Sequence, residues 1–183
     1  KCMVMYYLPM IAEKLLQDRL EAFGAILIEG PKWTGKTTTA VQHAKSVIRL
    51  QDPDKVDEYV ATAATMPSLL LKGDKPRLID EWQDAPKIWD AVRLAVDNSG
   101  GQPGQYILTG SNTVDKAKIR HTGTGRITRM KMYPMSLWES KDSSGEVSIN
   151  ARFDNPHYDI NGATSHLDIP SLIRVACRGG WPV

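Results

Sequence analysis

The strongest constraint on the fold is the segment from Gly30 to Thr37, which reads GPKWTGKT. It fits the pattern G-x-x-x-x-G-K-[ST], in which two glycines let the backbone wrap closely and point its N–H groups at phosphate oxygens. An apolar run, Ala25–Glu29, precedes the segment, and a helical pattern that begins near Lys36 follows it. A strand, a glycine-containing loop and a helix in this order predict a phosphate-binding loop, to which the helix adds its positive end.

Each polar position of this loop has an expected role. Gly30 and Gly35 would let backbone donors approach the phosphates, and Lys36 would reach the β- and γ-phosphates. Thr37 would offer its hydroxyl to Mg²⁺, and Thr38 would contact the α-phosphate. The alternative is a turn of similar composition, which the flanking strand and helix disfavour. The sequence therefore predicts binding of ATP together with Mg²⁺.

Two adjacent carboxylates, Asp80 and Glu81, end a second apolar run at residues 77–81. Asp80 would hold Mg²⁺, directly or through water. Glu81 would orient and activate a water, a role that hydrolysis needs and transfer of phosphate to a small molecule does not. The alternative is an ordinary helix-capping or surface pair. Given the loop, the pair favours hydrolysis, with Lys36 offsetting charge on the phosphates.

Ser111 and Asn112 close a third apolar run that begins at Tyr106. A polar side chain at this strand end could contact the γ-phosphate or the attacking water, as a sensor does. Gly110, Ser111 and Asn112 are also favoured in turns. Ser111 and Asn112 are therefore interpreted either as a sensor of the γ-phosphate or as part of a turn.

Residues 116–131 carry six Lys and Arg side chains and no acidic residue. Such a run is often a solvated basic face, but here it follows the expected sensor strand. An arginine finger, which stabilises charge in phosphoryl transfer, is therefore a rival interpretation, with Arg126 as the candidate. Nucleic-acid binding is a third reading, although the chain lacks a stripe of basic and aromatic residues.

The alternation of apolar runs and helical patterns predicts an α/β fold, a parallel sheet with helices on both faces. The polar clusters at 30–38, 80–81 and 109–112 all fall at strand ends, where such sheets bind ligands. We expect an amphipathic helix packed on the core within residues 1–24, a P-loop core at 25–140, and a loop insertion followed by a helix at 141–183.

Composition excludes several classes of protein. A net charge of +2 is too mild to indicate nucleic-acid binding by itself. Two cysteines, Cys2 and Cys177, form no disulfide framework, so a cytoplasmic location is expected. No apolar stretch reaches the roughly 18 residues of a membrane span, so no membrane partner is expected.

Five stretches together resemble the AAA-type ATPases of bacteria and archaea that carry a C-terminal domain of unknown function. They are LIEGPKWTGKTTTA, LIDEWQDAPKIWDAVR, YILTGS, GTGRITRMKMYPMSLWES and CRGGWP. The resemblance implies a three-layer P-loop fold of the AAA type, with the sensor strand between the Walker A and Walker B strands. Family members usually continue beyond GGWP, so residues 141–183 would lead towards a further domain that is missing here. The site residues that the resemblance implies are Lys36 and Thr37 in Walker A, Asp80 and Glu81 in Walker B, Ser111 as sensor and Arg126 as the arginine.

Two functions follow from these observations. The first is Mg²⁺-dependent ATP hydrolysis, which is expected to be slow unless a partner or an assembly of identical chains supplies an arginine. The second is a nucleotide-gated module that binds DNA or another protein and uses hydrolysis only to reset its contacts. Glu81 favours the first function, and the basic stretch at 116–131 leaves room for the second.

Overall fold

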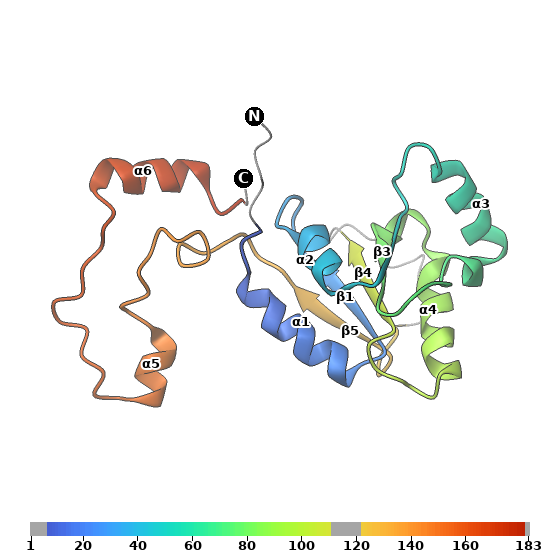
Figure 1. The fold of residues 1–183 in the computed structure, drawn as a ribbon, viewed down its shortest axis with the longest axis horizontal. Helices are drawn as coiled ribbons and strands as arrows, with labels where there is room; N and C mark the ends of the chain where they lie inside the picture. The colour runs from blue at the N-terminus through green and yellow to red at the C-terminus, as the bar shows by residue number, and fades with distance from the viewer. Residues whose placement is uncertain (1–6, 111–121, 182–183) are drawn as a thin grey trace. The chain divides into compact units, whose positions relative to one another are not determined.

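The computed structural model describes residues 7–110 and 122–181, which fall into two compact units (Figure 1). Ile11–Tyr133 forms the first unit. Residues 7–10 and 134–181 belong to the second. All described side chains of the predicted nucleotide site lie in the first unit.

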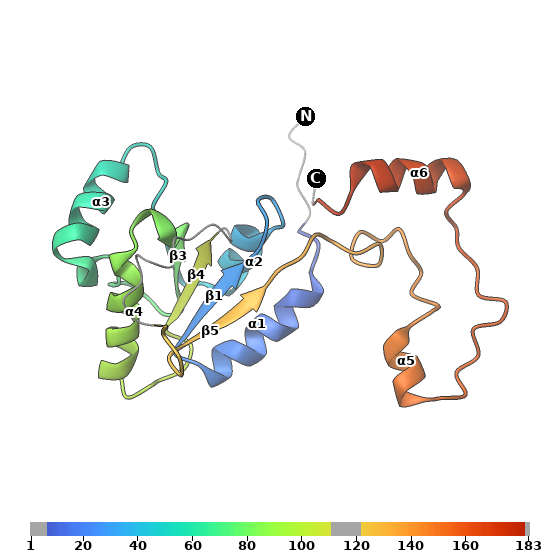
Figure 2. The same ribbon diagram turned by 180° about the vertical axis from the view of Figure 1, so that it is seen from behind.

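The first unit is built on a five-stranded parallel sheet, and in Figure 2 the arrows of β1, β4 and β5 point the same way. The strand order is β2-β3-β4-β1-β5, so β4 lies between β1 and β3. The predicted three-layer α/β fold, with the sensor strand between the Walker A and Walker B strands, is thus confirmed. The strands are β1 (Ala25–Glu29), β2 (Ser46–Arg49), β3 (Arg77–Asp80), β4 (Tyr106–Gly110) and β5 (Ile127–Lys131).

Helices connect these strands. The sequence analysis does not predict α3, whose ten residues bury only one side chain, Ala63. Two short 3₁₀ helices accompany the α-helices, η1 (Pro67–Leu69) and η2 (Trp82–Asp84). The α-helices of this unit are α1 (Ile11–Ala22), α2 (Lys36–His43), α3 (Val56–Thr65) and α4 (Lys87–Asn98).

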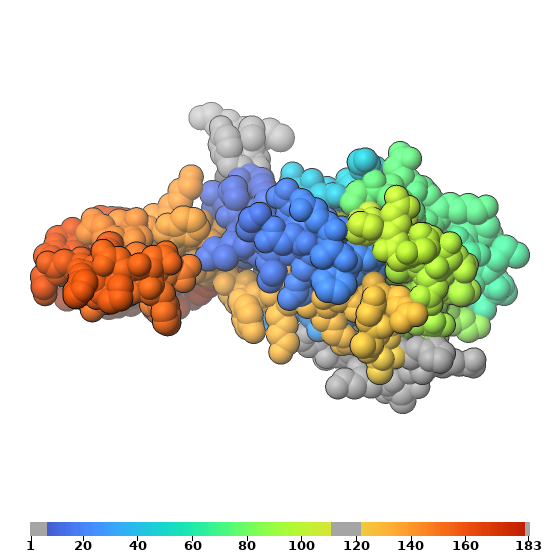
Figure 3. All heavy atoms as spheres, turned by 90° about the horizontal axis from the view of Figure 1, so that it is seen from below, coloured from blue at the N-terminus to red at the C-terminus, as the bar shows by residue number. Residues whose placement is uncertain are grey.

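Helix α1 covers the sheet less completely than its amphipathic pattern predicts. It contacts β1, but among its apolar side chains only Leu16 is fully buried. Ile11 is 62% exposed and Leu15 is 42% exposed. The helix accordingly forms part of the molecular surface, as the blue spheres in Figure 3 show.

The main core packs α4 against one face of the sheet. Leu27 and Leu108, from neighbouring strands, lie in one cluster with Trp89 and Val92 of α4. Trp82 joins them, and its ring centroid lies 4.9 Å from that of Trp89. Both tryptophans are buried. Since Trp82 follows Asp80 and Glu81 directly, this core fixes the chain at the point where the two carboxylates leave β3.

The second unit contains α5 (Ile149–Asp154) and α6 (Ile169–Arg178). Helix α5 falls inside the region that the sequence pattern predicts as loop, and no described residue of either helix is buried. Helix α6 is capped at its start, because the Asp168 side chain accepts a hydrogen bond from the Ser171 N–H.

Candidate functional site

The loop after β1 has the closed shape that a phosphate cradle requires. A Cβ atom at Gly30 would lie 2.4 Å from the Met132 carbonyl oxygen, so no larger residue fits there. Gly35 has a φ of +85°, in the left-handed region that favours glycine. The buried Thr34 hydroxyl donates to the Pro31 carbonyl oxygen at 3.0 Å and ties the loop to itself. The two glycines of the motif are therefore both required by local geometry.

Lys36 starts α2 and lies inside the loop. Its side chain is buried, and Nζ donates to the carbonyl oxygens of Gly30 at 2.9 Å and Pro31 at 2.6 Å. Burial lowers the pKa of Lys36, whereas the nearby carboxylates of Glu81 and Asp80 act in the opposite direction. The ammonium group thus contacts the loop carbonyls and is influenced by both carboxylates, and phosphate oxygens would further stabilise its charge.

Asp80 joins three segments at the carboxyl edge of the sheet. It is buried, and its Oδ1 accepts a hydrogen bond from the Thr37 hydroxyl at 2.7 Å and another from the Thr109 hydroxyl. The structure therefore brings together the two residues that the sequence proposes for Mg²⁺. Hard oxygen donors of this kind suit Mg²⁺, which usually takes few protein ligands and completes its shell with water and phosphate.

The sequence analysis includes Thr109 in the polar cluster at 109–112 but gives it no role of its own. Besides donating to Asp80, its Oγ1 accepts a hydrogen bond from the backbone N–H of Glu81 at 3.2 Å. Thr109 is fully buried one position before the end of β4. A buried polar residue late in an apolar strand that neighbours β3 is the signal that could have revealed it.

Glu81 leaves the strand in an unusual backbone conformation. Its φ is +56°, which is uncommon for a residue with a side chain. The Gln83 side-chain amide donates a hydrogen bond to Oε2 of Glu81. The carboxylate that the sequence proposes as the water-activating group is thus held by contacts on both its backbone and its side chain.

The other residues that the sequence proposes for the site are not all found beside Asp80 and Lys36. Thr38 is exposed on the first turn of α2. Ser111 and Asn112 lie outside the described residues, so the sensor role stays a prediction. Arg126 precedes β5, and its carbonyl oxygen accepts from the N–H of Ala25 at the start of β1. Arg126 is therefore at the amino edge of the sheet, opposite the phosphate loop of its own chain.

Comparison with known proteins agrees with this geometry. Residues 22–141 match the AAA domain family, which covers the sheet, the phosphate loop and both carboxylates. The chain belongs to this family. AAA domains are ATP-binding ATPases, and the family often forms oligomers. No curated protein matches the chain. Within the residues that the structure describes, no helix of this AAA-domain protein is long and apolar enough to cross a bilayer.

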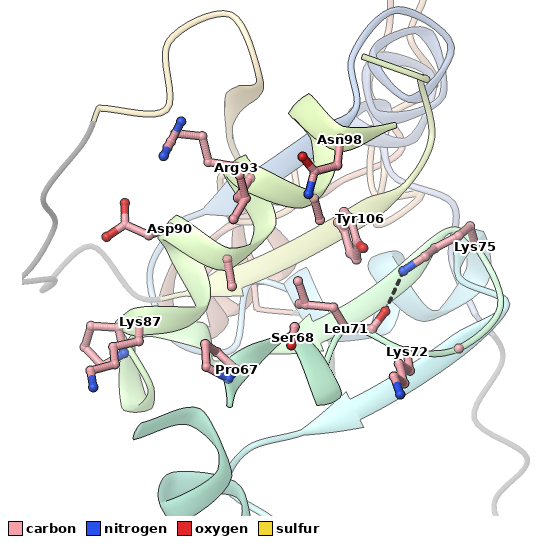
Figure 4. A pocket seen from close by; sticks show the side chains of 15 residues that line it. Pro67, Ser68, Leu71, Lys72, Lys75, Lys87, Asp90, Arg93, Asn98 and Tyr106 are labelled. Carbon is pink, nitrogen blue, oxygen red and sulfur yellow. Dashed lines mark hydrogen bonds between the residues drawn. The ribbon is translucent and has the colours of Figure 1, made fainter. Parts of the chain in front are cut away.

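A cavity of about 1170 Å³ lies beside α4, away from the phosphate loop (Figure 4). Lys75 contributes its most perturbed side chain, with Nζ 3.7 Å from the centre of the Tyr106 ring and 2.7 Å from the Leu71 carbonyl oxygen. Burial, with a smaller contribution from Arg77, lowers the pKa of Lys75 to about 8. This amine is therefore distinguished chemically from an ordinary surface lysine.

We expect Lys75 to be acylated faster than other lysines near neutral pH. With a pKa of about 8, about a quarter of its amines are neutral at pH 7.5, against about one in a thousand for an ordinary lysine. Labelling should rise as pH increases through 8 and then level off. Brief labelling followed by peptide mass spectrometry measures this, with the exposed Lys72 in the same cavity as the comparison. Equal labelling of the two lysines would contradict the expectation.

Proposed function

We propose that this AAA domain hydrolyses Mg²⁺-bound ATP at the carboxyl edge of its sheet. The observation that carries the proposal is the junction at Asp80, where hydroxyls from the phosphate loop and from β4 meet one carboxylate. Glu81 stands next to this junction, and its charge acts on Lys36. Binding alone would be served by the loop, whereas a second carboxylate beside it suits activation of water.

The side chains of the chain would divide the work as follows. Backbone N–H groups of the loop and the Lys36 ammonium would bind the phosphates and offset their charge. Thr37 and Asp80 would hold Mg²⁺, which when bound neutralises phosphate charge. Glu81 would accept a hydrogen bond from water and orient it towards the γ-phosphate. The Thr109 hydroxyl would hold Asp80 and the Glu81 backbone in position, because it donates to the Asp80 carboxylate and accepts from the Glu81 N–H.

Phosphate release with Mg²⁺ and ATP tests the proposal directly. We expect turnover that requires Mg²⁺ and stops when the metal is chelated, while a chain with no turnover at any protein concentration would refute it. The same assay with DNA added addresses the second function, a nucleotide-gated binding module. Hydrolysis that proceeds equally without DNA favours the ATPase as an activity in its own right.

We also propose that Arg126 acts only if a second chain delivers it. In its own chain the Arg126 guanidinium forms an ion pair with Asp97 at 2.6 Å and lies at the edge opposite the phosphate loop. A surface pair of this kind is worth about 0–1 kcal/mol, so it could be exchanged for a contact with a neighbouring nucleotide. An arginine finger delivered in this way contributes roughly 10³–10⁵ in rate.

For Arg126 we expect turnover per chain to rise with protein concentration, and Arg126→Ala to abolish that rise without changing ATP affinity. Mixing Arg126→Ala chains with Lys36→Ala chains should recover activity, because each supplies the group that the other lacks. Phosphate release measured across a concentration series checks both statements. Turnover that is independent of protein concentration, and equal in the wild type and Arg126→Ala, would show that Arg126 is an ordinary residue of a solvated basic face.

A further inference from the structure

Gln83 holds the carboxylate of Glu81 from a position two residues further along the chain. Its Nε2 donates to Glu81 Oε2, within the short η2 helix that follows β3. A carboxylate accepts this hydrogen bond only from the amide nitrogen, so the charge of Glu81 determines which way the Gln83 amide faces. The contact therefore fixes both side chains at once.

The end of β4 supports Gln83 from behind. A Cβ atom at Gly110 would lie 2.8 Å from Gln83 Oε1 and 2.9 Å from Trp82 Nε1, so both side chains rest against this glycine. Both of these atoms are buried and have no hydrogen-bond partner among the described residues. Trp82 itself is fixed by its packing against Trp89. Gln83 is thus wedged between the last residue of β4 and the Glu81 carboxylate.

The direction in which Glu81 is held matters for function. After the effect of burial, Glu81 has the largest influence on the pKa of Lys36, ahead of Asp80, although Asp80 is the residue bonded to the loop threonine. The charge of the held carboxylate therefore acts on the lysine of the phosphate loop. Lys36 is the residue expected to meet the β- and γ-phosphates, so a carboxylate that acts on it suits a role at that end of the nucleotide.

We propose that Gln83 is a positioning residue that fixes Glu81 in the orientation needed to activate water, with Gly110 as the surface against which it is braced. This inference rests on the proposed hydrolytic function. Glu81 without this bond would keep its backbone position, because Thr109 holds its N–H, but its carboxylate would sample other rotamers. Nucleotide binding does not depend on those rotamers, so loss of the Gln83 hydrogen bond should lower the rate of the chemical step and leave ATP affinity unchanged.

The first test is Gln83→Met, which keeps the length and volume of the side chain but removes the donor. Misplacement of a reacting group by about 1 Å can cost about 100-fold in rate, so we expect kcat to fall by about 10- to 100-fold with ATP affinity unchanged. The matched control is Gln51→Met, because Gln51 Nε2 also donates to a carboxylate, that of Asp84, at 2.7 Å on the surface. That variant should keep the wild-type kcat.

Two further variants separate positioning from a merely structural role. Gly110→Ala should reproduce the loss of kcat, because its methyl group displaces Gln83. In a Glu81→Gln background, Gln83→Met should cause little further loss, because it acts through the carboxylate that is already gone. Thermal unfolding midpoints report whether each variant is folded, and calorimetric ATP binding reports whether its phosphate loop is intact.

The outcomes distinguish the inference from the function on which it rests. A wild-type chain that binds ATP but never hydrolyses it overturns the hydrolytic function. A wild-type chain that turns over, together with a folded Gln83→Met variant of equal or higher kcat, overturns the role of Gln83 alone. Additive losses in the double variant would also overturn it, since they would show that Gln83 acts independently of Glu81.

Discussion

Replacing Lys36 with alanine is expected to weaken ATP binding by at least tenfold. The ammonium group is buried inside the phosphate loop and donates to two of its carbonyl oxygens, at 2.9 and 2.6 Å. Hydrogen bonds to charged groups contribute roughly 1.5–3 kcal/mol each, which corresponds to about ten- to one-hundred-fold in affinity. Isothermal calorimetry with ATP and Mg²⁺ measures the change directly.

The control for this prediction is Lys72→Ala, which removes the same charge from an exposed position beside the cavity next to α4. We expect its ATP affinity to match the wild type. Unfolding midpoints of both variants would show whether the lost loop contacts of Lys36 affect stability. Wild-type affinity in a folded Lys36→Ala chain would contradict the interpretation of Gly30–Thr37 as a phosphate cradle.

The sheet and the phosphate loop could be predicted from the sequence because each rests on short-range signals. Three strands, β1, β3 and β4, coincide with apolar runs, and Gly30 and Gly35 occupy positions where a side chain would clash or the backbone is left-handed. The parallel sheet then places Asp80 near Thr37, because carboxyl ends of parallel strands share one edge. Chain order and strand direction are enough for this step.

The contacts of Thr109 and Gln83 could not be predicted in the same way. The contact of Thr109 with Asp80 and the approach of Gln83 to Gly110 depend on the register between β3 and β4, which pairs Ile79 with Leu108. No local pattern in the sequence fixes that register. Helix α3 is also missing from the prediction, since most of its residues are exposed and few of its side chains, such as Tyr59 and Ala63, face the core.

The edge of the sheet at which Arg126 lies could have been predicted from the sequence. Arg126 precedes its strand, whereas the phosphate loop follows β1, and in a parallel sheet these positions lie at opposite edges. The basic run at 116–131 suggested proximity to the γ-phosphate through its place in the chain. Strand direction places Arg126 at the edge opposite the phosphate loop of its own chain, so a role at the nucleotide would require Arg126 of a second copy.

The second large effect is expected for Glu81→Gln, which should slow hydrolysis by about 10²–10⁴-fold while Mg²⁺ and ATP remain bound. The substitution keeps the size of the side chain and leaves an oxygen that can still accept from the Gln83 amide. It removes the negative charge that would orient and activate water. Asp80→Asn should behave differently, because Asp80 meets the Thr37 hydroxyl, and its variant should need more Mg²⁺ for the same turnover.

Single-turnover phosphate release at saturating ATP measures the chemical step of Glu81→Gln without interference from binding. Glu58→Gln, the same change at an exposed position of α3, is the matched control and should hydrolyse ATP at the wild-type rate. The contrast between the Glu81 and Asp80 variants is the informative part, because a general loss of structure would lower both binding and turnover in each. A Glu81→Gln chain with normal single-turnover rates would show that another group activates the water. Asp80 would then be the first residue to reconsider, since its carboxylate accepts from the Thr37 and Thr109 hydroxyls at the same edge of the sheet.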